Sequence, residues 1–438
     1  ENPGIPRLSG REKGPNVSES VYVPGKGVGE IEAAPKRRRC AMMGGNVARD
    51  GGDGVALGFD EPIRGVNLGN WLVLERWMTP GLFRTSGEAD EIWMHRTMPS
   101  DALDRLLRRH RETYVTLDDF RAIAAHGCNL VRIPVPYFIF GDVPGHPGCV
   151  GFLDRAFDWA NATGLKVLID LHTVPGSQNG YDNGGLTGVC RWRRSPKAVG
   201  FALDVLTRLA ARYRDDPALF GIEVLNEPVS WLVYRTASST GAARDAAEAR
   251  GSGHVPMRFL KAFYRESYRR LRGLLRPETV IMFHDGFRLG AWGDWFVREG
   301  MRNVVLDTHI YLVGLDAFSP VHTMRAYRAY LRWSERRIRR AARHTPVVVG
   351  EWSLANAMAR RVAGRAEPSE RQSAEDRIYR DLAAMQRRTW DAGAGHIFWS
   401  YQLRRLRDGS GPRPGREPWS LSDAWRNGWI SGLNAERR

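Results

Sequence analysis

The chain has 438 residues, enough for one large domain or two ordinary ones, and 42% of them are hydrophobic, which supports a substantial core. The formal net charge is +16, but the basic residues lie mostly in helical stretches such as 336–343, without the interleaved aromatic residues of a nucleic-acid site. This pattern is typical of a solvated helix face, so we expect no nucleic-acid partner. No apolar run is long enough to predict a membrane span.

Residues 1–60 contain many Gly, Pro and charged residues, almost no aromatic residues and a basic cluster at 36–39. Such a composition buries too little apolar surface to offset the entropy of ordering, so we predict a mostly disordered leader. The basic cluster then belongs to a solvated tail, with a nuclear or processing signal as the alternative. Residues 61–438 are predicted to form a single folded domain.

Short apolar segments alternate with amphipathic ones from residue 62 onward. The predicted strands are 63–68, 129–133, 166–171, 220–225, 279–284, 303–308, 346–351 and 395–400. The predicted helices lie around 101–126, 152–164, 196–214, 256–275, 321–343 and 372–392. Eight apolar strands separated mainly by helices indicate an α/β fold, and at this length a closed (β/α)₈ TIM barrel. An open doubly wound sheet is the competitor, but the first strand is followed by no Gly-rich phosphate loop.

Three connections are long, namely 69–100, 172–195 and 229–255. Loops after the strands are where barrel enzymes build their pockets. We expect 229–255, which is rich in small and polar residues, to be an exposed excursion. Cys149 and Cys190 both fall in predicted loops and are candidates for a disulfide, a point that matters only for a secreted protein.

Two glutamates close predicted strands. Glu227 follows the strand 220–225, where Pro228 is expected to stop the ladder, and Glu351 ends the strand 346–351. Polar or aromatic residues recur at the ends of other strands: Arg132, His172, Asn226, His309, Tyr311 and Trp399. Singly, each has a structural explanation as a core histidine, an ion pair or packing. Together they favour a site, and because the histidines and acids are spread along the chain, we expect no metal and no cofactor.

Paired carboxylates suit hydrolysis of a glycosidic bond, which needs a proton donor on the leaving oxygen and a carboxylate below the sugar ring. We assign Glu227 as general acid/base and Glu351 as nucleophile. Asn226 is expected to hold the sugar 2-hydroxyl, and Trp399 to form an apolar floor. Three further side chains are expected to support the glutamates: Tyr311 and Arg132 act on Glu351, and His309 acts on Glu227. A buried carboxylate partner is expected for Arg132.

The chain resembles glycoside hydrolase family 5, and within it most closely the exo-1,3-β-glucanase branch. The resemblance rests on 64–75 (RGVNLGNWLVLE), 131–134 (VRIP), 170–172 (DLH), 175–183 (PGSQNGYDN), 225–228 (LNEP), 283–287 (FHDGF), 309–311 (HIY), 350–353 (GEWS) and 398–400 (FWS), in this order. It implies a retaining (β/α)₈ glycosidase, with Glu75 and Asp182 bound to the terminal glucose in a closed, exo-acting pocket. Tyr181, in the same motif as Asp182, is a further expected pocket residue.

The chain departs from the family at its long insertion after Pro228 and at 313–314, where no aromatic residue follows Tyr311. Our leading hypothesis is an extracellular or cell-wall-associated monomeric enzyme, with 61–438 as catalytic domain, that removes glucose from β-1,3-glucan. The nearest alternatives are an endo-glucanase, a β-mannanase or a glycolipid β-glucosidase. An alternative of another class is a non-catalytic barrel that binds carbohydrate or a polyanion.

Overall fold

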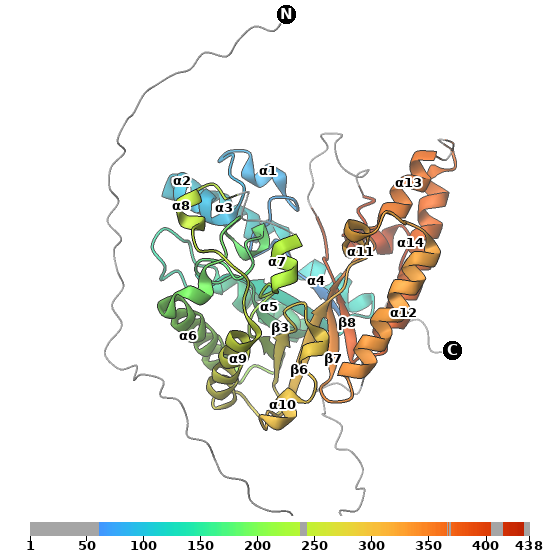
Figure 1. The fold of residues 1–438 in the computed structure, drawn as a ribbon. Helices are drawn as coiled ribbons and strands as arrows, with labels where there is room; N and C mark the ends of the chain where they lie inside the picture. The colour runs from blue at the N-terminus through green and yellow to red at the C-terminus, as the bar shows by residue number, and fades with distance from the viewer. Residues whose placement is uncertain (1–60, 237–242, 366, 368, 404–414, 433–438) are drawn as a thin grey trace, which may run out of the picture. The chain divides into compact units, whose positions relative to one another are not determined.

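The computed structural model describes residues 61–236, 243–365, 367, 369–403 and 415–432. The predicted leader, 1–60, lies outside the described residues, so its disorder stays a prediction. Eight parallel strands pair in chain order, and β8 pairs with β1 to close a barrel (Figure 1). The (β/α)₈ prediction is therefore confirmed. The strands are β1 (Ile63–Asn67), β2 (Leu130–Val135), β3 (Lys166–Leu171), β4 (Leu219–Glu223), β5 (Val280–His284), β6 (Val304–His309), β7 (Val347–Trp352) and β8 (Gly395–Phe398).

The strands are buried on both faces, which explains their near-continuous apolar sequences. The side chains that fill the inside of the barrel come from every strand: Ile63, Leu130, Leu168, Phe220, Val280, Met282, Val305, Val348 and Ile397. A larger apolar cluster lies between the sheet and the helices. Because the barrel interior is packed, only the strand ends and the loops that follow them are available for a site.

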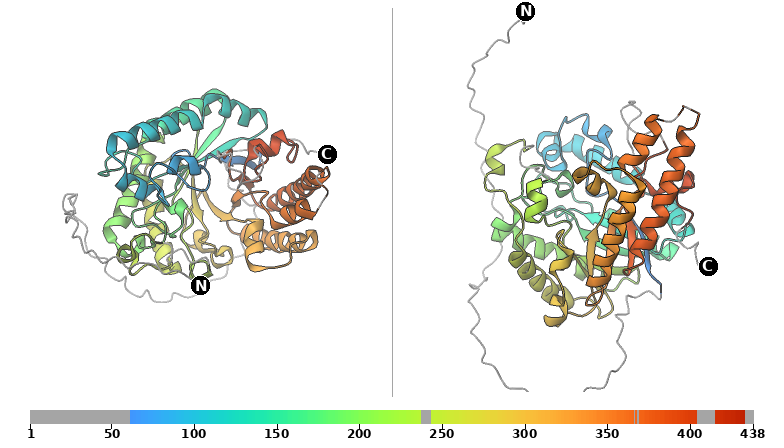
Figure 2. Two further views of the ribbon diagram at one scale, coloured as in Figure 1. Left: turned by 90° about the horizontal axis from the view of Figure 1, so that it is seen from above. Right: turned by 45° about the vertical axis from the view of Figure 1, so that its right-hand side comes forward.

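The helices surround the strands, as the view from above shows (Figure 2). They are α1 (Pro80–Phe83), α2 (Glu91–Thr97), α3 (Ser100–Tyr114), α4 (Leu117–Ala125), α5 (Val150–Thr163), α6 (Pro196–Tyr213), α7 (Trp231–Thr236), α8 (Ala246–Ala249), α9 (Met257–Arg272), α10 (Trp295–Arg298), α11 (Leu312–Phe318), α12 (Met324–Ala341), α13 (Ala357–Arg365), α14 (Arg371–Trp390) and α15 (Leu421–Arg426). The single helix predicted over 101–126 is two helices, because Thr116 and Asp119 form a capping box that starts α4 afresh.

Three strand predictions were wrong by two residues at their C-terminal ends. The second strand continues through Pro134 to Val135, whereas the fourth strand ends at Glu223, short of the predicted residue 225, and the eighth ends at Phe398, short of the predicted residue 400. The backbone still follows the ladder beyond β4, since the amide of Val224 donates to Met282 and the amide of Asn226 donates to Leu171. The chain thus reaches Glu227 along the barrel rim before Pro228 turns it away.

The connection 229–255 carries α7 and α8, and residues 237–242 within it lie outside the described part. Its described residues around 231–236 and 244–248 are largely exposed, as predicted, with Trp231 at 60% exposure, but both of its ends are buried at Val229 and Val255. The disulfide considered between Cys149 and Cys190 is wrong. Both thiols are free and buried, and the Cys190 thiol donates to the Gly253 carbonyl.

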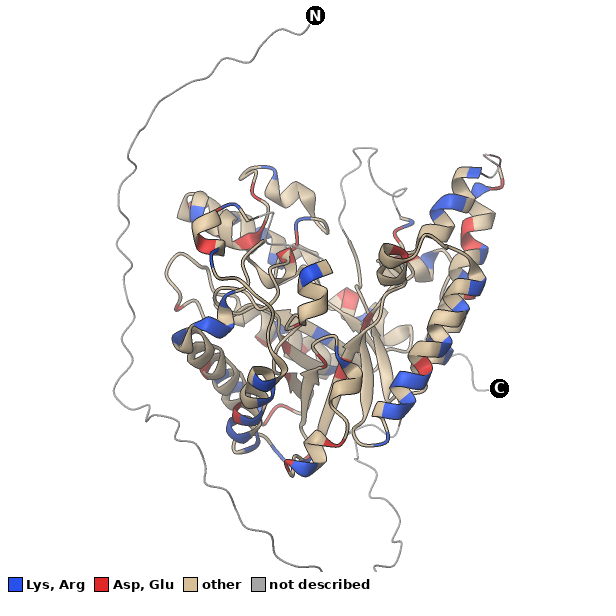
Figure 3. Ribbon diagram, viewed as in Figure 1, with Lys and Arg blue, Asp and Glu red and all other residues tan. Residues whose placement is uncertain are grey.

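Basic residues gather on the outer helices, most plainly along α12 and α14 (Figure 3). On α12 the side chains of Arg328, Arg332, Arg336 and Arg340 are exposed, while Leu331 and Ile338 face the core. This is the solvated helix face expected from the sequence. Within the described residues, no helix combines the length and the apolar character that crossing a membrane requires.

Candidate active site

Glu227 and Glu351 lie at the ends of strands on different sides of the barrel. Glu351 is part of β7, where the pairing with β6 shifts register so that Glu351 stands opposite His309. Glu227 follows β4 and has a left-handed backbone with φ of 43°. A residue other than glycine is strained there, so surrounding contacts must hold it in place. Both carboxylates are buried.

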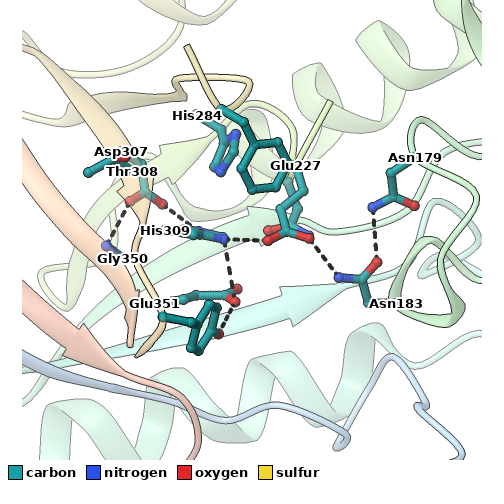
Figure 4. A network of polar contacts seen from close by, with 12 residues as sticks. Asn179, Asn183, Glu227, His284, Asp307, Thr308, His309, Gly350 and Glu351 are labelled. Atoms are coloured by element: carbon teal, nitrogen blue, oxygen red, sulfur yellow. Dashed lines mark hydrogen bonds and ion pairs between the residues drawn. The ribbon is translucent and has the colours of Figure 1, made fainter. Parts of the chain in front are cut away.

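His309 joins the two glutamates (Figure 4). Its Nδ1 lies 2.8 Å from Oε1 of Glu227 and 3.4 Å from Oε2 of Glu351. These two carboxylate oxygens are therefore no farther apart than the sum of the two distances. The predicted contact between His309 and Glu227 is present, and the same ring also reaches Glu351.

Arg132 is fully buried and has the carboxylate partners that its position in an apolar strand requires. Its guanidinium lies 2.7 Å from Glu223, 3.0 Å from Glu351 and 3.2 Å from Asp170. It also donates to Asn226 Oδ1 at 2.9 Å. One guanidinium thus fixes the position of Glu351 and of the amide beside Glu227.

The other predicted strand-end residues surround this pair. The Tyr311 hydroxyl donates to Glu351 Oε2 at 2.6 Å. The His172 ring lies 2.5 Å from Asp170 and stacks on Trp399, with 9° between the ring planes. Gly69 makes room for Trp399, because a Cβ at this glycine would lie 2.8 Å from the indole.

Glu75, Tyr181 and Asp182 lie on the loops that follow β1 and β3. Trp77 Nε1 donates to Glu75 Oε2 at 2.7 Å. Tyr181 and Asp182, with Trp77, line an open pocket of about 520 Å³ whose outer edge includes Arg76. Burial, and then the negative charge of Asp182, raise the pKa of Glu75 well above its usual value.

Four site residues were not assigned from the sequence. Asn183 donates to Glu227 Oε2 at 2.9 Å, and Asp307 lies 3.2 Å from His309 Nε2. The ring of Trp419 lies between Tyr311 and Trp77, with centroid distances of 5.2 and 5.3 Å. Asn183 stands directly after Asp182, so the motif 175–183 contained a signal for it. Trp77 and Trp419 carried no such signal.

The two glutamates differ in their affinity for a proton. Burial raises the pKa of Glu351, and the charges of His309 and Arg132 oppose this without cancelling it. Burial also acts on Glu227, but the hydrogen bond and charge of His309 outweigh it and lower the pKa to about 2. This direction is unexpected for a general acid. The pKa of His309 is well above its usual value because Glu351 and Asp307 outweigh its burial, so the proton next to Glu227 rests on His309.

Glu227, His284 and His309 are close enough together to share a metal ion. Their hydrogen bonds do not suit one. Both ring nitrogens of His309 face carboxylates, which only accept, and His284 Nδ1 accepts from the Gly286 amide, which leaves the hydrogen on Nε2. Neither imidazole therefore offers a lone pair toward the cluster.

Comparisons with known proteins identify the family of the chain. The model of the family Cellulase (glycosyl hydrolase family 5) matches residues 107–248. A probable glucan 1,3-beta-glucosidase A from Aspergillus fumigatus is 33% identical over 342 residues, which cover 74% of this chain and 71% of that protein. Its counterpart in Aspergillus terreus is 31% identical over 399 residues, 84% of this chain and 87% of that protein.

Among solved structures, the rutinosidase from Aspergillus niger superposes with a TM-score of 0.66 at 19% identity, over 84% of this chain and 98% of that one. This similarity supports the barrel fold. The sequence relatives extend over most of both chains, and their identity is high enough to establish the family. The chain belongs to glycosyl hydrolase family 5, in the branch of the glucan 1,3-β-glucosidases, and is an O-glycosyl hydrolase.

Proposed function

We propose that this protein is a retaining β-glycosidase that removes glucose from the end of β-1,3-glucan, with Glu227 as acid/base and Glu351 as nucleophile. The observation that carries the proposal is the bridge that His309 forms between the two glutamates. It limits the gap between their facing oxygens to less than the roughly 6.5–9.5 Å that an inverting enzyme needs for its water.

In the first step, a carboxylate oxygen of Glu351 attacks the anomeric carbon of the terminal glucose. The bond to the leaving oxygen breaks, and that oxygen takes a proton from Glu227. Arg132 and Tyr311 hold Glu351 in place with two short contacts and favour its charged form. Nucleophile and donor thus approach the same glycosidic bond from opposite sides.

In the second step, Glu227 takes a proton from water, and the water oxygen attacks the anomeric carbon, which releases Glu351. Two inversions give net retention. Asn226 is suited to hold the 2-hydroxyl of the sugar, because Arg132 fixes its carbonyl oxygen and its amide nitrogen, which lies 3.4 Å from His172 Nε2, has a second hydrogen to donate. Trp399 would form the apolar floor under the ring.

The substrate assignment rests on the relatives, which are named glucan 1,3-beta-glucosidases, and on the carboxylates of Glu75 and Asp182, which suit the hydroxyls of a terminal sugar. For a polymeric glucan substrate we also infer an extracellular location. Membership in a hydrolase family favours the enzyme over a non-catalytic polyanion-binding barrel.

The test is release of glucose from a laminarin-type glucan. The Glu351→Gln variant keeps the size of the side chain but removes the nucleophile, so we expect kcat to fall on the order of 10⁴-fold, about 5.5 kcal/mol. Circular dichroism and thermal unfolding of the variant serve as the control for folding. Full activity of this variant would refute the assignment.

The pocket beside Asp182 favours a second candidate. Its volume of about 520 Å³ falls in the range of ligand sites and extends past the residues expected to hold the terminal sugar. This space would suit an additional sugar, as in an endo-acting or disaccharide-releasing enzyme. Product length during the first minutes separates the two candidates, because an exo enzyme yields glucose alone and the second candidate yields oligosaccharides.

A further inference from the structure

Asp307 is a fully buried carboxylate next to the site, and the mechanism above gives it no part. It lies on β6, two residues before His309, so both side chains point toward the same side of the strand. One oxygen, Oδ2, is 3.2 Å from His309 Nε2. Figure 4 shows the resulting row, in which the His309 ring lies between Asp307 on one side and the two glutamates on the other.

The position of Asp307 is fixed from β7. Its Oδ1 accepts the Gly350 amide at 2.7 Å. A Cβ at Gly350 would lie 2.2 Å from the carboxylate, so only glycine leaves room for Asp307 directly before Glu351. The carboxylate is thereby held against the strand that carries the proposed nucleophile.

The hydrogen-bond geometry also indicates the protonation state of His309. Carboxylates accept hydrogen bonds and do not donate them, and His309 Nδ1 faces glutamates while Nε2 faces Asp307. Both ring nitrogens therefore carry hydrogen. The ionisable groups around this charged ring are Glu223 and Glu227 from β4 and its end, His284 and Asp285 from β5 and its end, Asp307 from β6, Glu351 from β7 and Arg132 from β2.

We propose that Asp307 is a positioning residue that keeps a proton on His309, and that His309 and Glu227 together supply the proton taken by the leaving oxygen. The inference rests on the proposed roles of Glu227 and Glu351. During bond cleavage the proton on His309 Nδ1 moves to the carboxylate of Glu227, and Glu227 passes one proton on to the leaving oxygen and is again a carboxylate. His309 is then neutral and keeps its Nε2 hydrogen on Asp307. The water of the second step returns the proton by the same route.

The variant Asp307→Asn tests this inference. An asparagine amide can donate to His309 Nε2, which leaves a neutral ring still donating from Nδ1 to Glu227. The ring stays in place, but the negative charge that retained the second proton is gone. The proton shared by His309 and Glu227 is then lost to solvent at a lower pH than in the wild type. We expect the basic limb of the kcat/KM profile to move down by about 1–3 pH units.

The loss of activity above the shifted basic limb should depend on the leaving group of the substrate. A dinitrophenyl glucoside needs no proton on its leaving oxygen, so Asp307→Asn should cleave it at wild-type rates above the shifted limb. An alkyl glucoside or a glucan should lose activity there at least tenfold. A purely structural defect would lower both rates at every pH and would not move the limb.

Asp285→Asn is the matched control. Asp285 is equally buried, at the end of β5, but its carboxylate accepts from the Thr308 hydroxyl and the Phe287 amide and forms no hydrogen bond with His309 in the described structure. The charge of Asp285 also acts on His309, but without a direct contact, so the basic limb of the Asp285→Asn kcat/KM profile should move clearly less than that of Asp307→Asn. An unmoved limb in folded Asp307→Asn would overturn the inference and leave the proposed function intact. Wild-type protein that cleaves neither glucoside would refute the proposed function itself.

Discussion

Glu227 and Glu351 are the same residue type at the same end of one barrel, yet their neighbours differ. Glu351 is held by Arg132 and Tyr311, groups that keep their protons at any ordinary pH. Glu227 is held by Asn183 and by His309, an imidazole that can give a proton up. Glu351 is thus fixed by groups that do not exchange protons, whereas Glu227 lies beside a group that can exchange one. The neighbours, more than the position in the fold, distinguish the two roles.

The backbone conformations of the two glutamates also differ. Glu351 belongs to the strand β7, whereas Glu227 has a left-handed conformation, which for a non-glycine residue costs on the order of 1 kcal/mol or more. Contacts from His309 and Asn183 offset this strain and turn the Glu227 carboxylate toward Glu351. Each of the following variants alters one side of this comparison.

The largest effect is expected on the side of Glu227. In Glu227→Gln the proposed proton donor is lost, and general acid catalysis typically contributes about 10²–10⁴-fold. Alkyl glucosides should show this loss, and the first step with a dinitrophenyl glucoside should not. Burst kinetics with the dinitrophenyl substrate measures that step. An equal loss on both substrates would mean that Glu227 is not the donor.

On the side of Glu351, Arg132→Met should destabilise the protein strongly. It removes the cation among Glu223, Asp170 and Glu351, which leaves buried carboxylates without a partner. Breaking a buried ion pair in this way costs about 3–5 kcal/mol of the free energy of unfolding. Denaturant unfolding checks this value, and a loss below 1 kcal/mol would contradict the assigned importance of this cation.

Tyr311→Phe removes a single hydrogen bond to Glu351, the proposed nucleophile. A hydrogen bond to a charged group contributes about 1.5–3 kcal/mol, so kcat/KM should fall by about 10–150-fold. The hydroxyl favours the charged form of Glu351, and its removal therefore raises the pKa of that carboxyl. Activity should accordingly disappear at a higher pH than in the wild type as the solution is acidified. An acid limb that stays in place would argue against this contact.

The smallest effect is expected far from both glutamates. Arg336 is exposed on α12, and Arg336→Glu should change the free energy of unfolding by less than about 0.5 kcal/mol. The kcat/KM for an uncharged glucoside should stay unchanged. A clear change in either quantity would show that the basic helix face contributes to the site.

The sequence was sufficient to predict the barrel because each strand is buried on both faces and therefore reads as an apolar run. It was also sufficient for the contacts of Arg132, since an arginine in such a strand needs a buried carboxylate. The end of β4 was predicted too late, because Val224 and Asn226 keep ladder hydrogen bonds outside the regular strand. The hydrophobic pattern alone does not distinguish a regular strand from an extended segment that continues its hydrogen bonds.

Asp307 and Trp419 show what the sequence did not reveal. Asp307 reads as an ordinary polar residue in a strand until the β6–β7 register places it against Gly350. Trp419 reaches the site only because the chain returns to the barrel rim after β8, where Leu354 and Ser400 hydrogen-bond to Pro418 and Trp419. Both depend on contacts between segments that are distant along the chain, which local patterns do not encode.

The most direct test of the central claim is to trap the covalent intermediate. A 2-deoxy-2-fluoro-β-glucosyl fluoride has a leaving group that needs little help from an acid, and its fluorine slows the second step. Incubation followed by peptide mass mapping should find the fluoroglucosyl group on Glu351. A label on Glu227, or turnover through an inverted product without any label, would contradict the account.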